Sequence, residues 1–528
     1  MYVPRRSGQS LSRRSATRWA CAILTVSATA CSELAREVTP PSAVVLTGGA
    51  SYYAAPSGTP TGDGSITNPW DLRTAFGGGG RVQAGDTVWL RGGLYNGFTS
   101  QLLVTTIGAP GAFVVFRQYP SERATIDVNG ATSSTSRGDA IVVTGDYTAL
   151  WGFEVVDSSS VRDATRANMI VNDASHTKYI NLVIHDGGIA FYNYSNRLDV
   201  EVAGCIIYNN GWPEPPYGNG HALYVKSDVG PLVLRDNVLF NQFGYGVHAY
   251  TNEGTGQLVN ITVRGNASFD NGALSTLTSP NILVGGYAAA RQITVDSNMT
   301  YFDPTLNAEW NIRLGWPGIL SHDLTFKNNY VVGLTSASLL YHWEWETSTV
   351  RDNVFQAPDV PGPNNLIYDL RDPMDGVRAY DWGGNTHYRD PAAPGWYHFG
   401  FKTWAQWLAN TGLGSTDQVI AGTPSTTKVF VRKNTYEPGR AHIIVYNWAN
   451  LGSVNADLSG VLAPGDHYEI RSVQGLWGSP AASGTYGGGT VSLPMTPATS
   501  PPTPIGPVSR QPPTTGPAFD VFVVTKVP

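Results

Sequence analysis

The nine residues LVLRDNVLF at positions 232–240 contain the feature that decides the fold. Their asparagine returns in similar short segments at steps of 24 to 32 residues, as Asn237, Asn266, Asn298, Asn329, Asn353 and Asn385. Toward the N-terminus, the same slot is expected at Cys205, Asn181 and Phe153. Self-similarity with a period of roughly 20–50 residues is typical of a solenoid of stacked repeats.

Each repeat contains two short strands and no helical periodicity. One strand holds the asparagine, and another precedes it, as at residues 221–225, 246–250, 281–284 and 311–314. Apolar residues alternate in these runs, and Gly, Asn and Asp bound them, as in β-strands. If each repeat is one coil, equivalent strands stack about 4.8 Å apart and their asparagines can form a ladder. Because an unpaired buried amide costs about 1–3 kcal/mol, the ladder explains why Asn recurs.

The entry to this region resembles the first coil of known secreted proteins. The segments YYAAPSG (52–58), NPW (68–70) and GDTVWLRGGLY (85–95) follow one another in this order. In this the chain resembles the right-handed parallel β-helix proteins of the pectate-lyase-like superfamily, over residues 50–400. The resemblance implies an all-β fold, and we expect a right-handed parallel β-helix followed by a small C-terminal β-sandwich.

The N-terminus has the pattern of an export signal. Five arginines between Arg5 and Arg18 precede an apolar run at residues 19–30, which is too short for a membrane span. Because the run ends in ATACS, it resembles a bacterial lipoprotein signal with Cys31 as the lipidated residue. We therefore expect an extracytoplasmic protein, either secreted or a lipoprotein of the outer membrane or cell surface, with a lipid anchor as its only membrane contact.

The remaining chain divides by pattern. We expect a signal peptide at 1–31, a linker at 32–49, the β-helix at 50–400, a helical connector at 401–424 and the β-sandwich at 425–528. Separated strands at 429–431, 442–448, 467–470 and 519–524 predict the sandwich. The Pro-rich stretch at 494–517 is expected to be a surface loop, and Cys205 a buried residue without a disulfide.

Composition excludes one class of partner and favours another. The net charge is −6 and only 14% of residues are charged, so there is no basic stripe for nucleic acid. Fifteen Trp and 26 Tyr suit stacking on sugar rings. We expect a monomer that binds a polysaccharide.

Alternation along the strands predicts which side chains leave the core. If Leu223, Val225, Val247, Ala249, Ile282, Val284, Ile312 and Leu314 point inward, their neighbours form an outward row. The candidate catalytic residues are His248, Arg313, Tyr250, Tyr224 and Lys226. The candidate substrate-binding residues are Tyr245, His221, Asn281, Trp316, His342, Trp343, Glu344 and Trp212. Long loops at 209–220, 270–280 and 302–310 are expected to wall a groove about four coils long.

Three functions fit such a groove. A lyase that acts on an acidic glycan by β-elimination needs a cation for the carboxylate, a base and an acid. The candidate catalytic residues include side chains of all three kinds. A glycoside hydrolase needs two carboxyl groups, and Glu344 and Glu346 share a face about 7 Å apart if extended. A non-catalytic glycan-binding or surface scaffold is the third possibility. The cofactor stays open, with Ca²⁺ possible near Asp and Asn in the turns.

Overall fold

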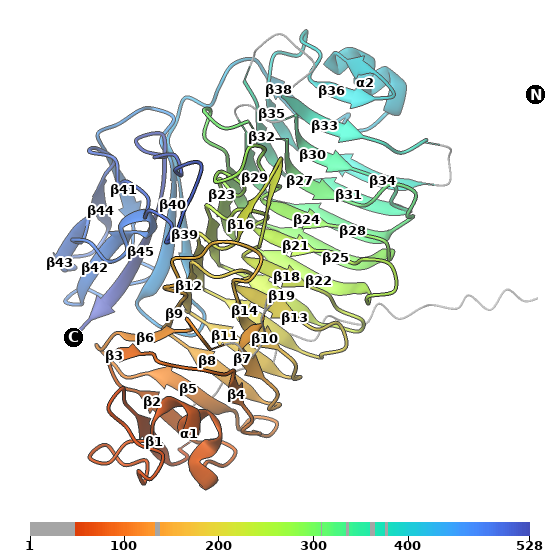
Figure 1. Cartoon of the computed structure of the whole chain (residues 1–528). Coiled ribbons are helices and arrows are strands. Elements are labelled where there is room, and N and C mark those ends of the chain that lie inside the picture. Colours follow the sequence, from red (N-terminus) through yellow and green to blue (C-terminus); the bar gives the residue numbers. More distant parts are fainter. Residues whose placement is uncertain (1–47, 132–137, 308, 334–336, 359–364, 375–377) are drawn as a thin grey trace, which may run out of the picture. The chain divides into compact units, whose positions relative to one another are not determined.

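The computed structural model describes residues 48–131, 138–307, 309–333, 337–358, 365–374 and 378–528. Three long sheets stack coil upon coil, and within the described residues each holds twelve strands (Figure 1). Sheet I contains, in stacking order, β1 (Ser51–Ala54), β2 (Thr87–Leu90), β5 (Val114–Gln118), β8 (Thr148–Trp151), β11 (Thr177–Ile180), β14 (Val200–Ala203), β19 (Leu232–Arg235), β22 (Leu258–Arg264), β25 (Ala290–Asp296), β28 (His322–Lys327), β31 (Thr347–Arg351) and β34 (Ala379–Gly383).

Sheets II and III complete each coil. Sheet II contains β3 (Gly93–Tyr95), β6 (Ala124–Asp127), β9 (Glu154–Val156), β12 (Val183–His185), β15 (Ile206–Tyr208), β20 (Val238–Phe240), β23 (Ala267–Phe269), β26 (Met299–Tyr301), β29 (Tyr330–Val332), β32 (Val354–Gln356), β35 (Thr386–Tyr388) and β38 (Gln418–Ile420). Sheet III contains β4 (Leu102–Val104), β7 (Asp139–Val143), β10 (Asn168–Asn172), β13 (Phe191–Asn193), β18 (Leu223–Val225), β21 (Val247–Ala249), β24 (Ile282–Val284), β27 (Trp310–Leu314), β30 (Ser338–His342), β33 (Leu366–Leu370), β36 (Trp396–His398) and the antiparallel β37 (Phe401–Lys402).

The solenoid interior is apolar, as the alternation predicts. All eight side chains expected to point inward on sheet III are buried in one continuous hydrophobic core. At the first coil, α1 (Leu72–Phe76) buries Leu72, Ala75 and Phe76 in this core, next to the 3₁₀ turn η1 (Gly78–Gly80).

The asparagine ladder is present at the turn between sheets I and II. The Oδ1 atom of Asn266 accepts from the backbone N–H of Asn237 at 3.0 Å and from its Nδ2 at 2.9 Å. The same pair of bonds repeats through Asn298, Asn329, Asn353 and Asn385, and it ends on Asp417. Since each Nδ2 also donates to a backbone carbonyl of the preceding coil, the buried amides are paired.

Toward the N-terminus, one predicted slot is wrong by a residue. Cys205 occupies the ladder slot, is buried, and burial raises the pKa of its thiol to about 12. The register of β12 with β15 places Leu182, not Asn181, in the next slot. Asn181 has φ of 52° and belongs to the left-handed position that precedes the slot, like Asp236 and Gly265. Asn, Asp and Gly tolerate this conformation, so the turn favours these residue types at the position before the ladder slot.

The solenoid continues beyond residue 400, where the sequence pattern placed its end. Helix α2 (Trp404–Thr411) begins with a capping box from Thr403 and buries Trp407 against the last coils. The strand β38 follows this helix and pairs in parallel with β35. The helix therefore covers the end of the core without ending sheet II (Figure 1).

The C-terminal region is a small β-sandwich. One sheet contains β39 (Lys428–Lys433), β40 (Arg440–Tyr446), β45 (Phe519–Val527), β42 (His467–Ser472) and β43 (Ala482–Thr485), with the 3₁₀ turn η2 (Val473–Gly475) after β42. The other contains β41 (Ser453–Asp457) and β44 (Thr490–Pro494). The outer face of the first sheet packs on sheet II, where Phe519 stacks on Tyr301 at 4.5 Å between ring centroids. The described residues of the solenoid and the sandwich thus form one compact unit.

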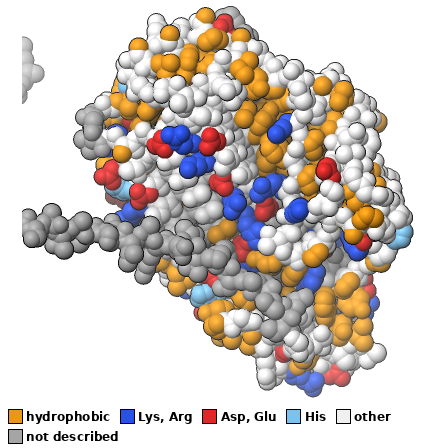
Figure 2. All heavy atoms as spheres, turned by 180° about the vertical axis from the view of Figure 1, so that it is seen from behind, with side chains coloured by type: hydrophobic (Ala, Val, Ile, Leu, Met, Phe, Trp, Pro, Cys, Tyr) orange, Lys and Arg blue, Asp and Glu red, His pale blue; other side chains and the backbone are white. Residues whose placement is uncertain are grey.

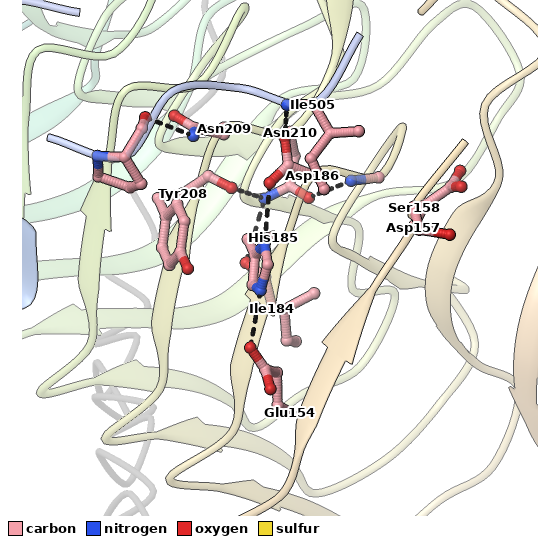
Figure 3. A network of polar contacts seen from close by, with 12 residues as sticks. Glu154, Asp157, Ser158, Ile184, His185, Asp186, Tyr208, Asn209, Asn210 and Ile505 are labelled. Carbon is pink, nitrogen blue, oxygen red and sulfur yellow. Dashed lines mark hydrogen bonds and ion pairs between the residues drawn. The ribbon is translucent and has the colours of Figure 1, made fainter. Parts of the chain in front are cut away.

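The Pro-rich stretch is held against sheet II by a buried polar network (Figure 3). His185 lies between Glu154, at 2.9 Å, and Asp186, at 2.8 Å. Asp186 accepts from the backbone N–H of Ile505 at 2.7 Å, and Arg162 donates to the Ile505 carbonyl at 2.7 Å. Burial raises the pKa of Glu154, but hydrogen bonds from His185 and Arg123 outweigh it and lower that pKa to about 2. We interpret this charged network as an anchor for the loop.

The predicted signal peptide, the lipidation site Cys31 and most of the linker lie outside the described residues. Among the residues that are described, no helix has the length and apolarity needed to cross a membrane.

Candidate active site

One row of side chains leaves the outer face of sheet III. The strand register places Tyr192, Tyr224, His248, Leu283, Arg313, Tyr341, Asp369 and Tyr397 at equivalent positions on consecutive coils. We call these eight residues the outward row. His248 and Arg313 therefore lie on the same face, two coils apart, as the alternation predicts. Although they lie on the outer face of the sheet, both residues are largely buried, with His248 8% exposed and Arg313 9% exposed.

Aromatic rings enclose the imidazole of His248. Tyr245 stacks on it at 4.2 Å between centroids, Tyr250 at 4.8 Å and Tyr224 at 5.0 Å. His221 meets it edge-on at 4.3 Å. Burial, together with the positive charges of His221, Arg313 and Lys226, lowers the pKa of His248 well below its usual range. The ring is therefore neutral near pH 7, and its buried Nδ1 has no hydrogen-bond partner among the described residues.

Arg313 is a buried cation without a carboxylate partner in the described part of the chain. Its guanidinium lies over the rings of Trp316 at 4.1 Å and Trp310 at 4.8 Å, and its Nε makes no hydrogen bond there. Burial lowers its pKa from the ordinary value. By contrast, Arg371 near the far end of the row is paired with Asp369 at 2.5 Å. A desolvated charge is costly when unpaired, so an anion bound at Arg313 would offset this cost.

The three long loops form one continuous wall beside the row. The Tyr217 hydroxyl donates to Glu309 at 2.9 Å, which joins the first loop to the third. Leu277 N–H donates to the Pro216 carbonyl at 3.0 Å, and Thr278 N–H to the Asn307 carbonyl at 3.2 Å. The first loop contains the hairpin β16 (Trp212–Glu214) and β17 (Tyr217–Asn219). The three loops are thus joined to one another, whereas the groove that they were expected to wall stays a prediction.

The remaining candidates near His248 supply proton donors and a second cation. Burial raises the pKa of Tyr245 and of Tyr250, so both hydroxyls are protonated near neutral pH. Burial lowers the pKa of Lys226, whose Nζ lies 3.4 Å from the Tyr192 hydroxyl and over the Tyr224 ring. The predicted residues Tyr224, Lys226, Tyr245, His221 and Trp316 are thus gathered around His248 and Arg313.

Several predicted site residues lie elsewhere. Asn281 is buried in a turn, where its Nδ2 donates to Asn311 at 3.0 Å, so both belong to an internal amide ladder. Trp212 is buried in the wall and His342 is fully buried inside the solenoid. These predictions are wrong because a polar residue just before a strand is held by the turn, and because β30 directs Tyr341, not His342, outward.

The internal His342 has a geometry that resembles a catalytic triad. Its Nδ1 lies 2.8 Å from Asp372 and its Nε2 lies 2.9 Å from the Ser348 hydroxyl. All three side chains are buried in the solenoid interior. A nucleophile needs to reach substrate, so this group is structural.

The predicted carboxylate pair of a hydrolase does not form. Glu344 has φ of 49°, which breaks the extended geometry that the pairing needs. Its carboxylate accepts from Trp343 Nε1 at 2.9 Å, whereas Glu346 pairs with His322. Trp343 itself is half-buried and its ring lies 5.5 Å from that of Tyr341.

Sequence reasoning missed part of the site. The row also contains Tyr192, Tyr341 and Tyr397. Extending the period-2 reading one coil at a time would have found the three tyrosines. No group of three or more His, Cys, Asp or Glu suited to a metal occurs in the described segments, and the Ca²⁺ expectation stays a prediction.

Comparison with known proteins supports the fold. A family model described as "Pel9A-like, right handed beta helix region" matches residues 52–286. Pectate lyase L of Thermoclostridium stercorarium is 24% identical over 241 residues, covering 43% of this chain and 18% of that protein. The match thus spans less than a fifth of the relative's length.

Solved structures with a similar course include a rhamnogalacturonan lyase, at 16% identity and a TM-score of 0.43 over 72% of this chain and 89% of that one. The GH136 lacto-N-biosidase from Eubacterium ramulus has 12% identity and a TM-score of 0.45, with 71% and 68% covered. Pectate lyase Pel9A has 16% identity and a TM-score of 0.36, with 73% and 80% covered. Residues 52–286 are thus similar to a right-handed β-helix region, and the strand topology shows a parallel β-helix with a β-sandwich packed against it.

Proposed function

We propose that this protein acts on a polysaccharide and cleaves an acidic glycan by β-elimination at the outward row of sheet III. The observation that carries the proposal is the buried Arg313, which has no carboxylate partner in the described segments and lies on the same face as the neutral His248. The family match to a Pel9A-like β-helix region and the identity to a pectate lyase are consistent with this chemistry. An extracytoplasmic location follows from the predicted export signal and belongs to the same proposal.

In the proposed reaction, Arg313 binds the carboxylate of a uronic acid and stabilises the negative charge that develops there. His248 takes the proton from the carbon beside that carboxylate. The electron pair of the broken C–H bond forms a double bond to the neighbouring carbon, and the bond from that carbon to the glycosidic oxygen breaks. A tyrosine hydroxyl, from Tyr250 or Tyr245, protonates the leaving oxygen.

The electrostatics of the site suit an anionic substrate. In the unliganded site, burial, followed by the charges of His221, Arg313 and Lys226, keeps the pKa of His248 low, which makes it a weak base. A bound carboxylate neutralises this positive charge and raises the pKa of a nearby histidine. The substrate would thus increase the basicity of His248 when it binds.

The aromatic side chains suit the sugar rings. Tyr224, Tyr250, Trp316 and Trp343 are partly exposed, and Tyr287 is more than half exposed next to Trp316. Such rings can stack on sugar faces along several coils.

The test is the chemistry of the product. The protein, incubated with polygalacturonate, other uronate polymers and neutral polysaccharides, should produce unsaturated uronate ends detected by their ultraviolet absorbance. Release of reducing ends without that absorbance would contradict the elimination and favour a hydrolase. Two separate carboxyl groups keep that alternative open: Oε2 of Glu309 is buried without a partner among the described residues, and burial raises the pKa of Asp369. Binding without cleavage of any polymer would favour the scaffold.

A further inference from the structure

A second concave surface lies on a different sheet, where the tip of the β39–β40 hairpin meets sheet I. A cavity of about 340 Å³ opens there, lined by Arg117, Tyr119, Trp151, Arg440 and Lys526 among others. Its volume lies at the lower end of the roughly 300–1,000 Å³ of ligand pockets. On the face seen in Figure 2, Lys and Arg side chains are interspersed with Asp and Glu side chains.

Two of the cations in this cavity, Arg117 and Arg440, have no carboxylate at ion-pair distance in the described segments. Arg117 stacks on Trp151 at 3.9 Å, and burial lowers its pKa. The Nε of Arg440 is buried and without a hydrogen-bond partner in the same segments. Glu437 also lines the cavity, where it accepts a hydrogen bond from Asn181 Nδ2 at 2.7 Å, and its negative charge opposes the effect of burial on the pKa of Arg117.

Other cations along the same junction are already paired. Arg123 pairs with Glu154 at 2.7 Å, Arg432 with Asp236 at 2.8 Å and Lys526 with Asp466 at 2.5 Å. The positive charge that remains for a ligand is thus concentrated on Arg117 and Arg440. Guanidinium groups suit carboxylates and sulfates because they donate two parallel hydrogen bonds.

Aromatic rings accompany the two arginines. Trp151 and Tyr119 both line the cavity, and Tyr119 is half-buried at its rim. Aromatic side chains next to unpaired arginines fit a ring that bears a negative group, since the ring can stack while its charge is bound.

We propose that this cavity binds the anionic group, a carboxylate or a sulfate ester, of an acidic polysaccharide chain, as a site separate from the outward row of sheet III. The choice of a glycan as ligand rests on the proposed function, whereas the preference for an anion rests on the cavity alone. Such a site would hold the polymer on the protein while other segments of it reach sheet III.

The test measures binding in the Arg313→Gln background, where the row on sheet III neither cleaves nor holds the probe through its cation. Oligogalacturonate, dextran sulfate and neutral dextran are titrated calorimetrically into the full chain. The Arg313→Gln protein should bind at least one anionic probe and not the neutral one. Adding Arg117→Gln and Arg440→Gln should weaken that binding at least tenfold. The two anionic probes distinguish carboxylate from sulfate recognition, and binding of neither would overturn the proposal.

Arg291→Gln in the same background is the matched control. This residue is exposed on β25 of sheet I and does not line the cavity, so its substitution removes one charge elsewhere and should change affinity less than twofold. An equal loss in this control, or unchanged binding in the double Arg variant, would overturn the proposal. Thermal melts check the fold of each variant. Tyr119→Ala, which removes no charge, gives a second variant that should weaken binding of the same probe; unchanged affinity there would also count against the site.

The outcome separates this site from the proposed reaction. Absence of cleavage by the native protein, with binding at the cavity retained, would remove the lyase proposal alone. Cleavage that persists in the Arg117→Gln, Arg440→Gln protein with unchanged affinity would remove the cavity proposal alone.

Discussion

His248 and Arg313 occupy equivalent positions on strands β21 and β27, separated on the outer face of sheet III by Leu283 alone. Adjacent strands lie about 4.8 Å apart, so two coils bring the residues to a spacing of roughly 10 Å, which the long arginine side chain shortens. This relation places a neutral imidazole two coils from a cation that has no carboxylate partner among the described residues, although the two are 65 residues apart in the sequence.

Arg313 should contribute more to catalysis than Arg371, which is already paired with a carboxylate. We expect Arg313→Gln to lower kcat/KM on a uronate polymer about 10²–10³-fold, since it removes a charge from the developing anion. Arg371→Gln is the control, because Arg371 lies on the same sheet but is already paired with Asp369. It should change the rate only a few-fold, measured from initial rates of product absorbance. Equal losses in the two variants would argue against a special role for Arg313.

Substitution of the base should separate catalysis from binding. We expect His248→Gln to lower kcat about 10²–10⁴-fold with little change in KM, because general-base catalysis acts in the transition state. In the native protein a bound carboxylate raises the pKa of His248. The acidic limb of the kcat profile should therefore lie at higher pH than that of kcat/KM. Coincident limbs in pH–rate profiles, or full activity in the variant, would exclude His248 as the base.

The ladder should contribute strongly to stability. Asn298→Ala removes an amide that bonds to Asn266, Asn329 and the Val263 carbonyl, and it leaves their buried groups unpaired. At about 1–3 kcal/mol for each unsatisfied group, we expect the free energy of unfolding to fall by about 3 kcal/mol or more. Asn129→Ala is the control, since Asn129 is exposed, and it should change stability by less than about 0.5 kcal/mol. Urea denaturation of both variants checks this, and similar midpoints would contradict it.

The packing of the sandwich on the solenoid should be acid-sensitive. Burial, with Arg440 and Arg432 nearby, lowers the pKa of His442 from 6.5 to about 3, against the hydrogen bond to the Asp236 carbonyl. Between these values the unfolded chain binds a proton that the folded protein does not, so stability falls as pH falls. The contribution amounts to at most about 1.4 kcal/mol per pH unit.

His442→Gln removes this titration. The difference in unfolding free energy between native and variant proteins should therefore change with pH between about 6.5 and 3, and stay constant above this window. Comparing the two proteins cancels the contributions of other titrating groups to the unfolding free energy. One of these is Asp520, whose pKa burial raises to about 6. A constant difference over the whole range, in chemical denaturation at a series of pH values, would contradict the assignment.

Much of the fold could be predicted because its signals are local and repeated. The Asn slots and the period-2 strands give the solenoid, and the alternation on β21 and β27 placed His248 and Arg313 correctly on one face. Errors arose where the coil changes geometry within one residue. Asn181 adopts a left-handed turn conformation, and Glu344 leaves the extended form, so their neighbours and not they continue the pattern.

Tertiary packing explains the rest of what the sequence could not indicate. Trp212 has the composition of a sugar-stacking residue, yet the wall loops bury it. Within the described segments Arg371 has a carboxylate partner and Arg313 has none, a difference that depends on how separate coils stack. The arginines of the junction cavity, Arg117 on β5 and Arg440 on β40, are more than 300 residues apart. The alternation of inward and outward residues relates only neighbouring coils, so it could not predict that they meet.

The most direct test of the central claim is a crystal structure of the His248→Gln protein with a uronate oligosaccharide. We predict that one sugar carboxylate lies within hydrogen-bond distance of the Arg313 guanidinium, with the carbon beside that carboxylate facing position 248. A saccharide bound to other faces of the protein, with the Arg313 guanidinium still without an anion, would contradict the account.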